Sequence, residues 1–348
     1  MRKLARVVEI EEIKAIENAD KICAYRVEGW WVVDTINKYK MGDVAIYFEI
    51  DSFIPTDLAP FLTKNDNPRI FNGVKGERLK TIKLRGQISQ GLLLGIDILT
   101  GKISSIPYEL GLDVSELLNI QKYENTIPAQ LSGEAKGLFP SFIFKTDEER
   151  IQNFSKELKY IKENNLSFEV TEKLDGSSMT VYLNQGIFGV CSRNLDLKET
   201  ENNSFWKMAR ELDLETRLIK YNSNIAIQGE LIGPGIQGNK YCLKKQEFRI
   251  FNIFDIDNQC NFSPLVRKVI CLYLGLDEMN CVPILAEKIV FPPLFEIDNI
   301  LNYAEGKSQL KSNIEREGLV FKCNETPEIH FKSISNKFLL KEFIEVKD

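Results

Sequence analysis

The chain has 348 residues, of which 43% are hydrophobic and 27% charged, a composition typical of a soluble protein with two domains. Its formal net charge of −5 gives no general attraction to nucleic acid, so any nucleic-acid surface must be a local basic face. Seven scattered cysteines without a Cys-x-x-Cys pair indicate free thiols in a reducing, cytoplasmic compartment, and the single histidine, His330, excludes a multi-histidine metal site.

Up to about residue 122 the sequence contains short strand patterns separated by turn residues. We expect strands at residues 5–10, 21–27, 31–36, 44–50, 81–84 and 91–96. Several short strands within about a hundred residues are typical of a small closed barrel, and the OB-fold is common where nucleic acid is the partner. In the pair Trp30-Trp31 we expect one ring in the core and one at the surface. Residues 1–122 are therefore predicted to form an OB-like β-barrel that binds nucleic acid.

One segment of this barrel carries a local excess of positive charge. Its basic residues face a single acidic neighbour in sequence, Glu77, and they are Lys75, Arg78, Lys80, Lys83 and Arg85. Such a cluster can bind the phosphates of a nucleic-acid backbone, although a charge run is often only a solvated face. These five basic residues are the candidate nucleic-acid contacts.

Residues 123–141 contain two prolines and two glycines and are expected to link the barrel to a second domain at residues 142–348. Thr146, followed at once by acidic residues, predicts the start of a helix. From about residue 167 strands alternate with helices, among them a helix at 205–220 capped by Asn203 or Ser204. The predicted fold class is therefore α+β.

The stretch FEVTEKLDGSSM at 168–179 places a lysine where a buried strand ends. A buried lysine is costly unless it has a partner or acts as a neutral amine. Asp175 is expected on the same strand face as Lys173, and Gly176 permits a turn and lets a substrate approach the backbone closely. A Lys-x-Asp-Gly match is a weak signal by itself, because a surface salt bridge before a turn explains it equally well.

Further polar and aromatic residues follow in order where later strands run or end. They are Arg193 after a strand at 187–190, Glu230 in an apolar strand, Phe251 in an aromatic strand, and Glu317, Lys322 and Lys332 in a hairpin. Taken separately, each has a structural explanation, such as an ion pair at a sheet edge or core packing. Chance does not easily supply the whole ordered series.

The segments that carry this series are KLDG at 173–176, SRN at 192–194, QGELIG at 228–233, FNI at 251–253, EGLVFK at 317–322 and FK at 331–332. In this order they resemble the successive motifs of covalent nucleotidyltransferases, the ATP-dependent polynucleotide ligases and the GTP-dependent capping enzymes. Within that superfamily the chain is most similar to RNA ligase family five, nick-sealing enzymes with an amino-terminal OB domain. Segments 47–53, 83–91 and 145–150 also resemble that family, so the resemblance covers nearly the whole chain.

The resemblance implies a three-step reaction. Lys173 attacks the α-phosphorus of ATP, expels pyrophosphate and holds AMP as a phosphoramidate. AMP then passes to the 5′-phosphate of a nick, and the 3′-hydroxyl finally attacks and releases AMP. Lysine reacts as a neutral amine, so its pKa must be lowered by a nearby cation or by desolvation. A divalent metal, Mg²⁺ or Mn²⁺, is such a cation.

The same resemblance implies a role for each candidate. Lys173, Asp175 and Lys332 are catalytic, and Glu317 and Glu230 are associated with the metal. The implied nucleotide contacts are Lys173 itself, the backbone of Glu172, Glu230 at the ribose hydroxyls, Phe251 stacked on adenine, Arg193 at phosphate or ribose, Lys322 and Lys332 at the α-phosphate, and Arg150.

Two positions depart from the family pattern. His330 stands where some relatives carry the first lysine of Lys-x-Lys, which leaves Lys332 as the dependable charge there. Asn252 replaces a common aspartate after the stacking aromatic, which concerns the adenine pocket and not the reaction.

We therefore expect an ATP-dependent RNA ligase that joins a 3′-hydroxyl to a 5′-phosphate at nicks in duplex RNA or RNA–DNA hybrids. The expected architecture is an OB barrel followed by a nucleotidyltransferase domain of ATP-grasp-like antiparallel sheets and helices. We expect a monomer. We also expect no membrane association, because no apolar run approaches the length of a membrane span. The alternatives are a DNA ligase and a nucleic-acid-binding module with an inactive transferase domain, and retention of Lys173, Glu230, Glu317 and Lys332 argues against the latter.

Overall fold

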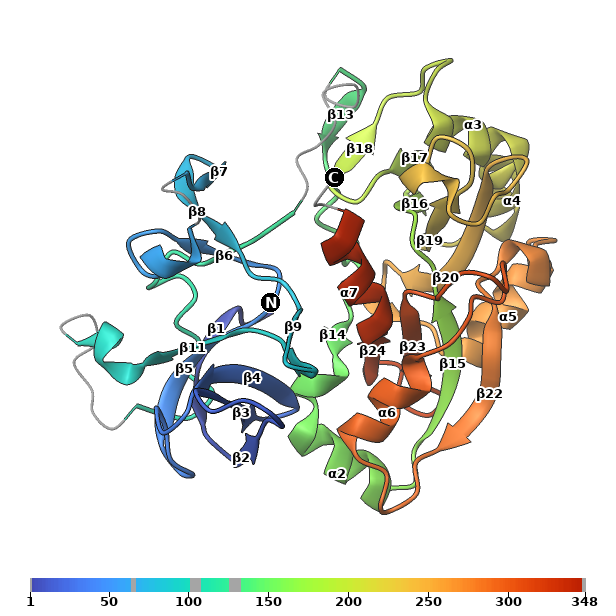
Figure 1. Cartoon of the computed structure of the whole chain (residues 1–348). Helices are drawn as coiled ribbons and strands as arrows, with labels where there is room; N and C mark the ends of the chain where they lie inside the picture. The colour runs from blue at the N-terminus through green and yellow to red at the C-terminus, as the bar shows by residue number, and fades with distance from the viewer. Residues whose placement is uncertain (1, 64–66, 101–107, 125–132, 346–348) are drawn as a thin grey trace. The chain divides into compact units, whose positions relative to one another are not determined.

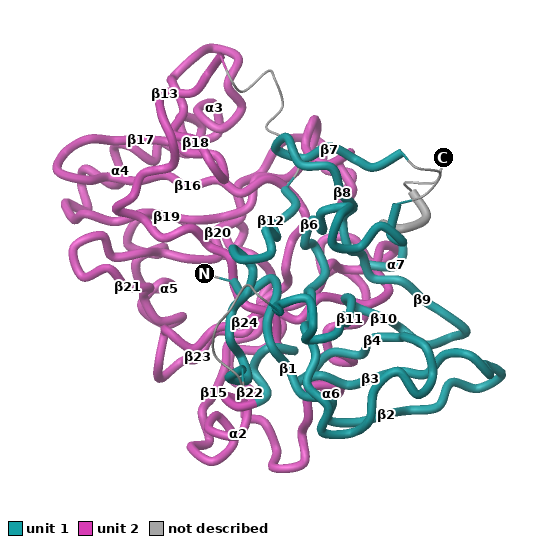
Figure 2. Tube along the Cα trace, turned by 90° about the vertical axis from the view of Figure 1, so that its left-hand side faces the viewer, with its two compact units in different colours: residues 1–126, 152–155, 339–348 teal, residues 127–151, 156–338 magenta. Residues whose placement is uncertain are grey.

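The computed structural model describes residues 2–63, 67–100, 108–124 and 133–345 (Figure 1). The chain divides into two compact units, coloured separately in Figure 2. Unit 1 comprises residues 1–126, 152–155 and 339–348, and unit 2 comprises residues 127–151 and 156–338. The units interleave along the sequence, whereas the sequence predicts a domain, a linker and a second domain in simple succession.

Unit 1 is built mainly of short strands. Its elements are β1 (Ala5–Glu9), β2 (Glu12–Ala15), β3 (Ile22–Val27), β4 (Trp30–Thr35), β5 (Val44–Phe48), β6 (Ser52–Pro55), β7 (Arg69–Phe71), β8 (Val74–Arg78), β9 (Ile82–Leu84), β10 (Gln87–Ser89), β11 (Leu92–Gly95) and β12 (Gln121–Lys122), with 3-10 turns η1 (Pro60–Leu62) and η2 (Ile96–Leu99). Within the described ranges they form antiparallel sheets of order β1-β5-β11, β2-β3-β4, β12-β6-β8-β7 and β10-β9. The predicted strands are all present. The sequence missed β2, for one, because every residue of β2 is exposed and no hydrophobic alternation marks it.

The aromatic core of unit 1 lies between β3, β4 and β5. Trp30 is fully buried there with Tyr25 and Tyr47. Trp31 is only partly buried, and the cations of Lys14 and Arg26 lie 5.8 and 5.4 Å from the centre of its ring. One core ring and one surface ring is the arrangement predicted for this pair.

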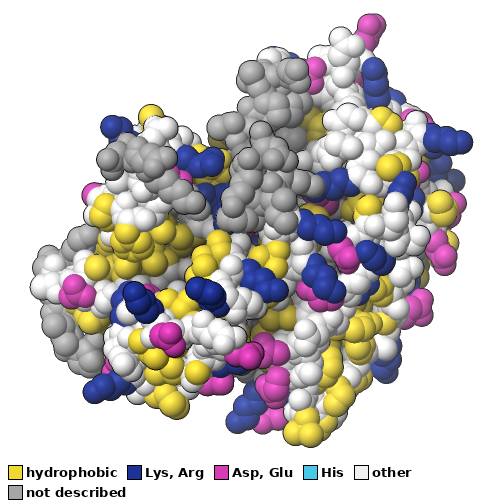
Figure 3. Space-filling view, in the orientation of Figure 1, with side chains coloured by type: hydrophobic (Ala, Val, Ile, Leu, Met, Phe, Trp, Pro, Cys, Tyr) yellow, Lys and Arg dark blue, Asp and Glu magenta, His cyan; other side chains and the backbone are white. Residues whose placement is uncertain are grey.

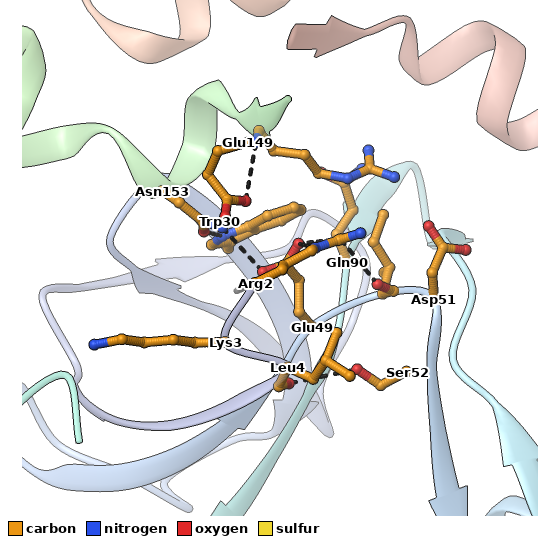
Figure 4. A network of polar contacts seen from close by, with 12 residues as sticks. Arg2, Lys3, Leu4, Trp30, Glu49, Asp51, Ser52, Gln90, Glu149 and Asn153 are labelled. Carbon is orange, nitrogen blue, oxygen red and sulfur yellow. Dashed lines mark hydrogen bonds and ion pairs between the residues drawn. The ribbon is translucent and has the colours of Figure 1, made fainter. Parts of the chain in front are cut away.

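A buried polar network ties Asn153 into unit 1 (Figure 4). The fully buried carboxylate of Glu49 pairs with the guanidinium groups of Arg2 and Arg6 and accepts a hydrogen bond from Asn153 Nδ2 at 3.0 Å. Asn153 Oδ1 accepts from Trp30 Nε1 at 2.6 Å and from Arg6 Nη2 at 2.7 Å. A buried carboxylate needs such compensation, because an unpaired charge in the interior is strongly destabilising. The network explains why residues 152–155 belong to unit 1.

Unit 2 combines two sheets with helices. Its elements are β13 (Ala135–Leu138), β14 (Glu149–Arg150), β15 (Ser167–Lys173), β16 (Ser177–Asn184), β17 (Ile187–Cys191), β18 (Leu195–Leu197), α3 (Ser204–Glu211), α4 (Leu214–Tyr221), β19 (Ile225–Ile232), η4 (Gln237–Asn239), β20 (Glu247–Asp255), β21 (Cys260–Asn261), α5 (Pro264–Tyr273), η5 (Glu278–Asn280), β22 (Ile284–Val290), α6 (Ile297–Ala304), β23 (Gly318–Cys323) and β24 (His330–Ile334). Three further elements, η3 (Ile151–Asn153), α2 (Ser155–Glu163) and α7 (Asn336–Glu345), cross the division between the units. The sheet orders are β13-β18-β17-β16-β19-β20-β21 and β14-β24-β23-β15-β22.

Two apolar clusters hold these sheets in place. The helices α3, α4 and α5 pack against the first sheet, with Trp206, Leu218 and Ile270 in the shared core (Figure 1). In the second sheet the rings of Phe168, Phe291, Phe321 and Phe331 contact one another, with Phe321 and Phe331 stacked at 4.9 Å. These contacts fix β15, β23 and β24, the strands that carry most of the conspicuous polar residues.

The helix predicted to begin near Thr146 begins instead at Ser155, as α2. The residues between them form β14, which pairs in parallel with β24, so strand pairing overrides the local helix signal. The helix predicted at 205–220 is two helices, because Asp213 between them adopts a left-handed conformation with φ of 50°. Asn203 caps α3, as predicted, by accepting from the backbone amides of residues 205 and 206.

Candidate active site

Lys173 is the last residue of β15, which lies between β23 and β22 in the second sheet. Its backbone pairs with Gly318, so that Glu317, the residue before β23, lies beside it. The Nζ atom of Lys173 is 2.6 Å from Oε1 of Glu317, and the exposed fractions of the two side chains are 28% and 15%. The predicted nucleophile and the predicted metal-associated carboxylate are thus in direct contact.

Asp175 lies in the turn between β15 and β16 rather than on the strand face predicted from the sequence. Its carboxylate pairs with the ammonium of Lys240, and its backbone amide donates to the hydroxyl of Tyr241 at 2.8 Å. The next residue, Gly176, has no room for a side chain. A Cβ atom there would lie 2.5 Å from the carbonyl oxygen of Leu231 and clash with it. The close approach at this glycine is therefore made by the backbone of β19, whereas the sequence predicted close approach by a substrate.

Glu230, on β19, completes a cluster of acidic groups around Lys173. Burial, together with the charges of Glu317 and Asp175, raises the pKa of Glu230 to about 8 against the opposing charge of Lys173. Burial by itself would lower the pKa of Lys173, but the carboxylates of Glu317, Glu230 and Asp175 outweigh it and raise that pKa. In this state the amine of Lys173 is therefore protonated and unreactive as a nucleophile.

The same cluster fits a divalent cation. The three carboxylates of Glu317, Glu230 and Asp175 face the two ammonium groups of Lys173 and Lys240, so ionisation of all three leaves one negative charge in excess. Among the described residues no group of three or more His, Cys, Asp or Glu is arranged as a complete metal site. A divalent cation held by Glu230 and Glu317 would therefore keep several water ligands, which is the habit of Mg²⁺ in proteins.

A second group of cations gathers around Asp147. Lys332 Nζ lies 3.2 Å and Arg193 Nη2 lies 3.9 Å from the same oxygen, Oδ1 of Asp147. Arg150 pairs in register with Lys332 across β14 and β24, and 5% of it is exposed. The structure thus brings together three basic residues that lie far apart in the sequence, all of them candidate nucleotide contacts.

Phe251 is held from its backbone side by two buried cations. Its carbonyl oxygen accepts from Lys322 Nζ at 2.7 Å and from Arg267 Nη1 at 3.2 Å. The ammonium of Lys322 also lies 5.7 Å from the centre of the Phe251 ring. Burial lowers the pKa of Lys322 to about 8, although Glu148 opposes the shift. Lys322 therefore supports the predicted stacking ring, and its contact with the α-phosphate stays a prediction.

The hydrogen bonds of Asn252 explain why an amide stands where relatives carry an aspartate. Its Oδ1 accepts from Lys322 Nζ at 3.0 Å, while its Nδ2 donates to Gln228 Oε1 at 2.7 Å and to Asn261 Oδ1 at 2.6 Å. An ionised aspartate could accept the first of these bonds but could not donate the other two.

Sequence reasoning missed Arg267, Glu169, Lys240 and Tyr241. Arg267 and Glu169 form an ion pair at 2.9 Å in which the side chains are only 2% and 1% exposed. The arginine lies on α5 in an ordinary helical pattern, so no sequence signal marks it. For Lys240 and Tyr241 the signal was the glycine-rich segment GPGIQGNKY at 233–241, which directly follows the strand of Glu230 and indicates a shaped loop.

His330 lies near an acidic residue that the sequence did not single out. Burial lowers the pKa of His330, while the charge of Glu148 opposes the shift. Burial would raise the pKa of Glu148, but Lys322, His330 and Lys332 outweigh it and lower that pKa. Glu148 is thus a shared counter-charge for the basic side chains of β23 and β24.

The five basic candidates of unit 1 fall on different elements. Lys75 is exposed on β8, whereas Lys83 and Arg85 are exposed on β9 and in the turn that follows it, and Lys80 is partly buried. Arg78 is ion-paired with Asp51 at 2.6 Å and lies over the ring of Tyr123 at 5.2 Å. On the face of the molecule drawn in Figure 3, basic side chains are interspersed with acidic and hydrophobic ones. Lys75, Lys83 and Arg85 are therefore the most accessible candidates.

Comparison with known proteins identifies the family of this fold and site. A family model described as RNA ligase matches residues 166–341, which include Lys173, Glu230, Phe251, Glu317 and Lys332. The chain belongs to the RNA ligase family. It is therefore an enzyme of the class expected from the sequence, and a second model, of an OB-fold domain, matches residues 4–96. Both matches confirm the α+β fold class with an amino-terminal OB-fold.

Solved structures of the Naegleria gruberi RNA ligase resemble this RNA ligase family member over its whole length. An aspartate-to-alanine mutant in the apo form has 40% identity and a TM-score of 0.89, with 99% of each chain covered. A lysine-to-alanine mutant with ATP and Mn has 41% identity and a TM-score of 0.87, covering 97% of this chain and 98% of that one. A glutamate-to-alanine mutant with AMP and Mn gives the same values. None of the curated proteins compared with the chain matches it.

Two further properties concern the whole enzyme. The structure records all seven cysteines as free thiols, as predicted. In the part of the chain that the structure describes, no helix is both long and apolar enough to cross a membrane.

Proposed function

We propose that this RNA ligase is ATP-dependent and seals 3′-hydroxyl/5′-phosphate nicks in duplex RNA or RNA–DNA hybrids through a lysine adenylate on Lys173. The observation that carries the proposal is the placement of Lys173 at the end of β15, 2.6 Å from Glu317 and close to Glu230. Similar structures that hold ATP or AMP together with Mn support ATP as the nucleotide and a divalent metal as the cofactor.

In the first step the lone pair of Lys173 Nζ attacks the α-phosphorus and pyrophosphate leaves. The proton must leave the ammonium first, because its acidic neighbours raise the pKa of Lys173. Glu230 and Glu317 would hold a divalent cation, whose positive charge would lower the pKa of the amine. Before the proton leaves, the ion pair with Glu317 holds Nζ at the end of its strand.

The remaining candidates suit the parts of a bound nucleotide. Phe251, with its backbone anchored by Lys322 and Arg267, would stack on adenine, and the backbone of Glu172 would line the base pocket. Such stacking contributes about 1–3 kcal/mol per base. Arg193, Lys332 and Arg150 would neutralise the phosphates, and guanidinium groups can do so with two parallel hydrogen bonds.

For the second and third steps we infer that unit 1 binds the nicked duplex. Lys75, Lys83 and Arg85 are exposed, and so are available to backbone phosphates, which carry most of the affinity for nucleic acids. A preference for RNA at the 3′-hydroxyl side would come from the shape of the minor groove and from 2′-hydroxyl contacts. We further propose that the enzyme acts as a monomer in the reducing cytoplasm.

The test of the first step is transfer of label from α-³²P-ATP to the protein in the presence of Mg²⁺ or Mn²⁺. We expect a labelled band on a denaturing gel for the wild type and for Lys207→Ala, an exposed lysine on α3, but not for Lys173→Ala. The label should be removed by pyrophosphate and should not form from GTP. A folded wild type that takes no label would leave a nucleic-acid-binding protein with an inactive transferase domain as the better account.

The test of substrate class compares sealing of four nicked duplexes that differ only in which strands are RNA or DNA. We expect joining when the 3′-hydroxyl strand is RNA and little joining when every strand is DNA. Efficient joining of the all-DNA nick would favour the alternative of a DNA ligase.

A further inference from the structure

Lys240 is a charged residue next to the candidate active site to which no role has yet been given. It directly follows the 3-10 turn η4, in the loop between β19 and β20. Its ammonium pairs with the carboxylate of Asp175, and the exposed fractions of the two side chains are 36% and 20%. Each lysine of the site therefore has its own carboxylate, since Lys173 pairs with Glu317 and Lys240 pairs with Asp175.

The neighbouring residue holds Asp175 by its main chain as well. The hydroxyl of Tyr241 accepts from the backbone amide of Asp175 at 2.8 Å, and only 5% of Tyr241 is exposed. Two consecutive residues of one loop thus engage both the side chain and the backbone of Asp175. Such a double contact restricts both where the carboxylate lies and which way it points.

The loop that carries Lys240 is itself shaped by local contacts. Asn239 exchanges two hydrogen bonds with the backbone of Leu243, each of 3.0 Å. Gly233, at the start of the loop, has φ of +118°, and a Cβ atom there would lie 2.6 Å from the carbonyl oxygen of Lys245. Only glycine fits this position, so the loop has one close-packed path. Lys240 is therefore presented from an ordered support.

The ammonium of Lys240 is covered on a further side by α7. The ring of Phe338 lies 5.0 Å from Nζ, within the range of a cation–π contact. The ammonium thus contacts a carboxylate and an aromatic face, which together favour one position of a long and otherwise flexible side chain.

We propose that Lys240 is a positioning residue of the ligation reaction, one that holds Asp175 away from the nucleophile Lys173 and toward the substrates. The proposal rests on the proposed function. Without Lys240, Asp175 still interacts electrostatically with the ammonium of Lys173, which already contacts Glu317. Asp175 would then turn toward Lys173 and compete with the arrangement that presents Nζ to ATP. Because Lys240 acts through Asp175, its loss changes the rate of adenylylation and not the affinity for ATP.

The experiment measures single-turnover labelling from α-³²P-ATP over a range of ATP concentrations for Lys240→Met, Lys240→Arg, Asp175→Asn and the Lys240→Met/Asp175→Asn double variant. Lys244→Met, an exposed lysine of the same loop, is the matched control. We expect Lys240→Met to lower the maximal rate of labelling about tenfold while the ATP concentration at half-maximal rate, the KM for ATP, stays unchanged, a coupling common for contacting residues. Lys240→Arg should restore most of the rate, and Lys244→Met should match the wild type.

The double variant decides whether Lys240 acts through Asp175. In the Asp175→Asn background, Lys240→Met should cause no further loss, because the partner it positions is already gone. A full additional tenfold loss there would overturn the proposal, and so would a rise in KM for ATP, which would make Lys240 a phosphate contact. If Asp175→Asn has no measurable activity, failure of Lys240→Arg to recover the rate overturns it. A wild type that takes no label refutes the proposed function itself, whereas a labelled wild type with an equally active Lys240→Met refutes only the role of Lys240.

Discussion

Breaking the buried ion pair between Arg267 and Glu169 should destabilise unit 2 far more than breaking an exposed pair. The substitution Glu169→Gln keeps the shape of the side chain but removes its charge. Arg267, only 2% exposed, is then left as a buried cation 2.9 Å from where its compensating charge stood, and Lys268 is a second cation 3.8 Å from the same oxygen. Orphaning one partner of such a pair costs about 3–5 kcal/mol.

The corresponding fall in melting temperature can be estimated. For a unit of roughly 200 residues, 1 kcal/mol corresponds to about 2–4 °C, so Glu169→Gln should melt about 6–20 °C lower. The control is Glu199→Gln, which breaks the exposed pair of Glu199 with Arg210, whose side chains are 50% and 44% exposed. An exposed pair contributes about 0–1 kcal/mol, so this control should move by less than about 4 °C.

The assay is calorimetry together with urea denaturation at pH 7.5, so that both temperature and free energy of unfolding are measured. A double variant, Glu169→Met with Arg267→Met, should recover part of the loss, because apolar groups of similar size leave no orphaned charge. If Glu169→Gln unfolds with the same midpoint as Glu199→Gln, the pair does not stabilise unit 2 and the anchoring of Phe251 by Arg267 needs another explanation.

Three further predictions concern the adenine pocket, a buried amine and the thiols. Phe251→Ala should raise KM for ATP by about 5- to 150-fold through lost stacking, measured by ATP titration of adenylylation, and an unchanged KM would show that the ring does not contact the base. Folding depresses the pKa of Lys322 from 10.5 to about 8, so the unfolded chain binds more protons in this window and stability should rise with pH there. Urea titrations at several pH values give the free energy of unfolding of the wild type and of Lys322→Met. The wild type minus variant difference should therefore grow as the pH rises from about 8 to 10.5, and a constant difference would refute the pKa shift of Lys322. In limited alkylation followed by peptide mass spectrometry, exposed Cys242 should react first, and the buried thiols should react only on unfolding. The buried thiols are Cys23, Cys191, Cys271 and Cys323. Equal rates of alkylation would contradict this difference in burial.

The sequence was most informative where a residue carries chemistry at the end of a strand. Lys173 at the end of β15 lies beside Glu317, which precedes β23 of the same sheet, and near Glu230 on β19 of the other sheet. Arg193 and Lys332 also lie together, although their common partner, Asp147, was taken for the first turn of a helix. Local acidic residues give the same signal at a helix start and before a buried strand pairing, and only the partner strand decides between them.

The parts that could not be predicted depend on contacts between distant residues. Arg267 supports Phe251 from a helix whose sequence is like that of any amphipathic helix, and its buried partner Glu169 alternates with apolar residues in β15. At position 252, asparagine differs from the aspartate common in relatives chiefly because its amide can donate hydrogen bonds. The acceptors of those bonds, Gln228 and Asn261, come from other strands. Pairwise complementarity of this kind is absent from a one-dimensional pattern.

The network around Asn153 has a consequence for any attempt to use the amino-terminal barrel as a separate part. A fragment that stops at residue 126 keeps Trp30, Arg6 and Glu49 but loses the amide that contacts all three. The indole N–H would lack its acceptor in the core, at a cost of about 1–3 kcal/mol for an unsatisfied buried group. Leu339, which packs against the same core, would be lost as well. The barrel therefore cannot be isolated as a stable fragment by one truncation. A version that folds on its own must also include the two short distant segments of unit 1, residues 152–155 and 339–348.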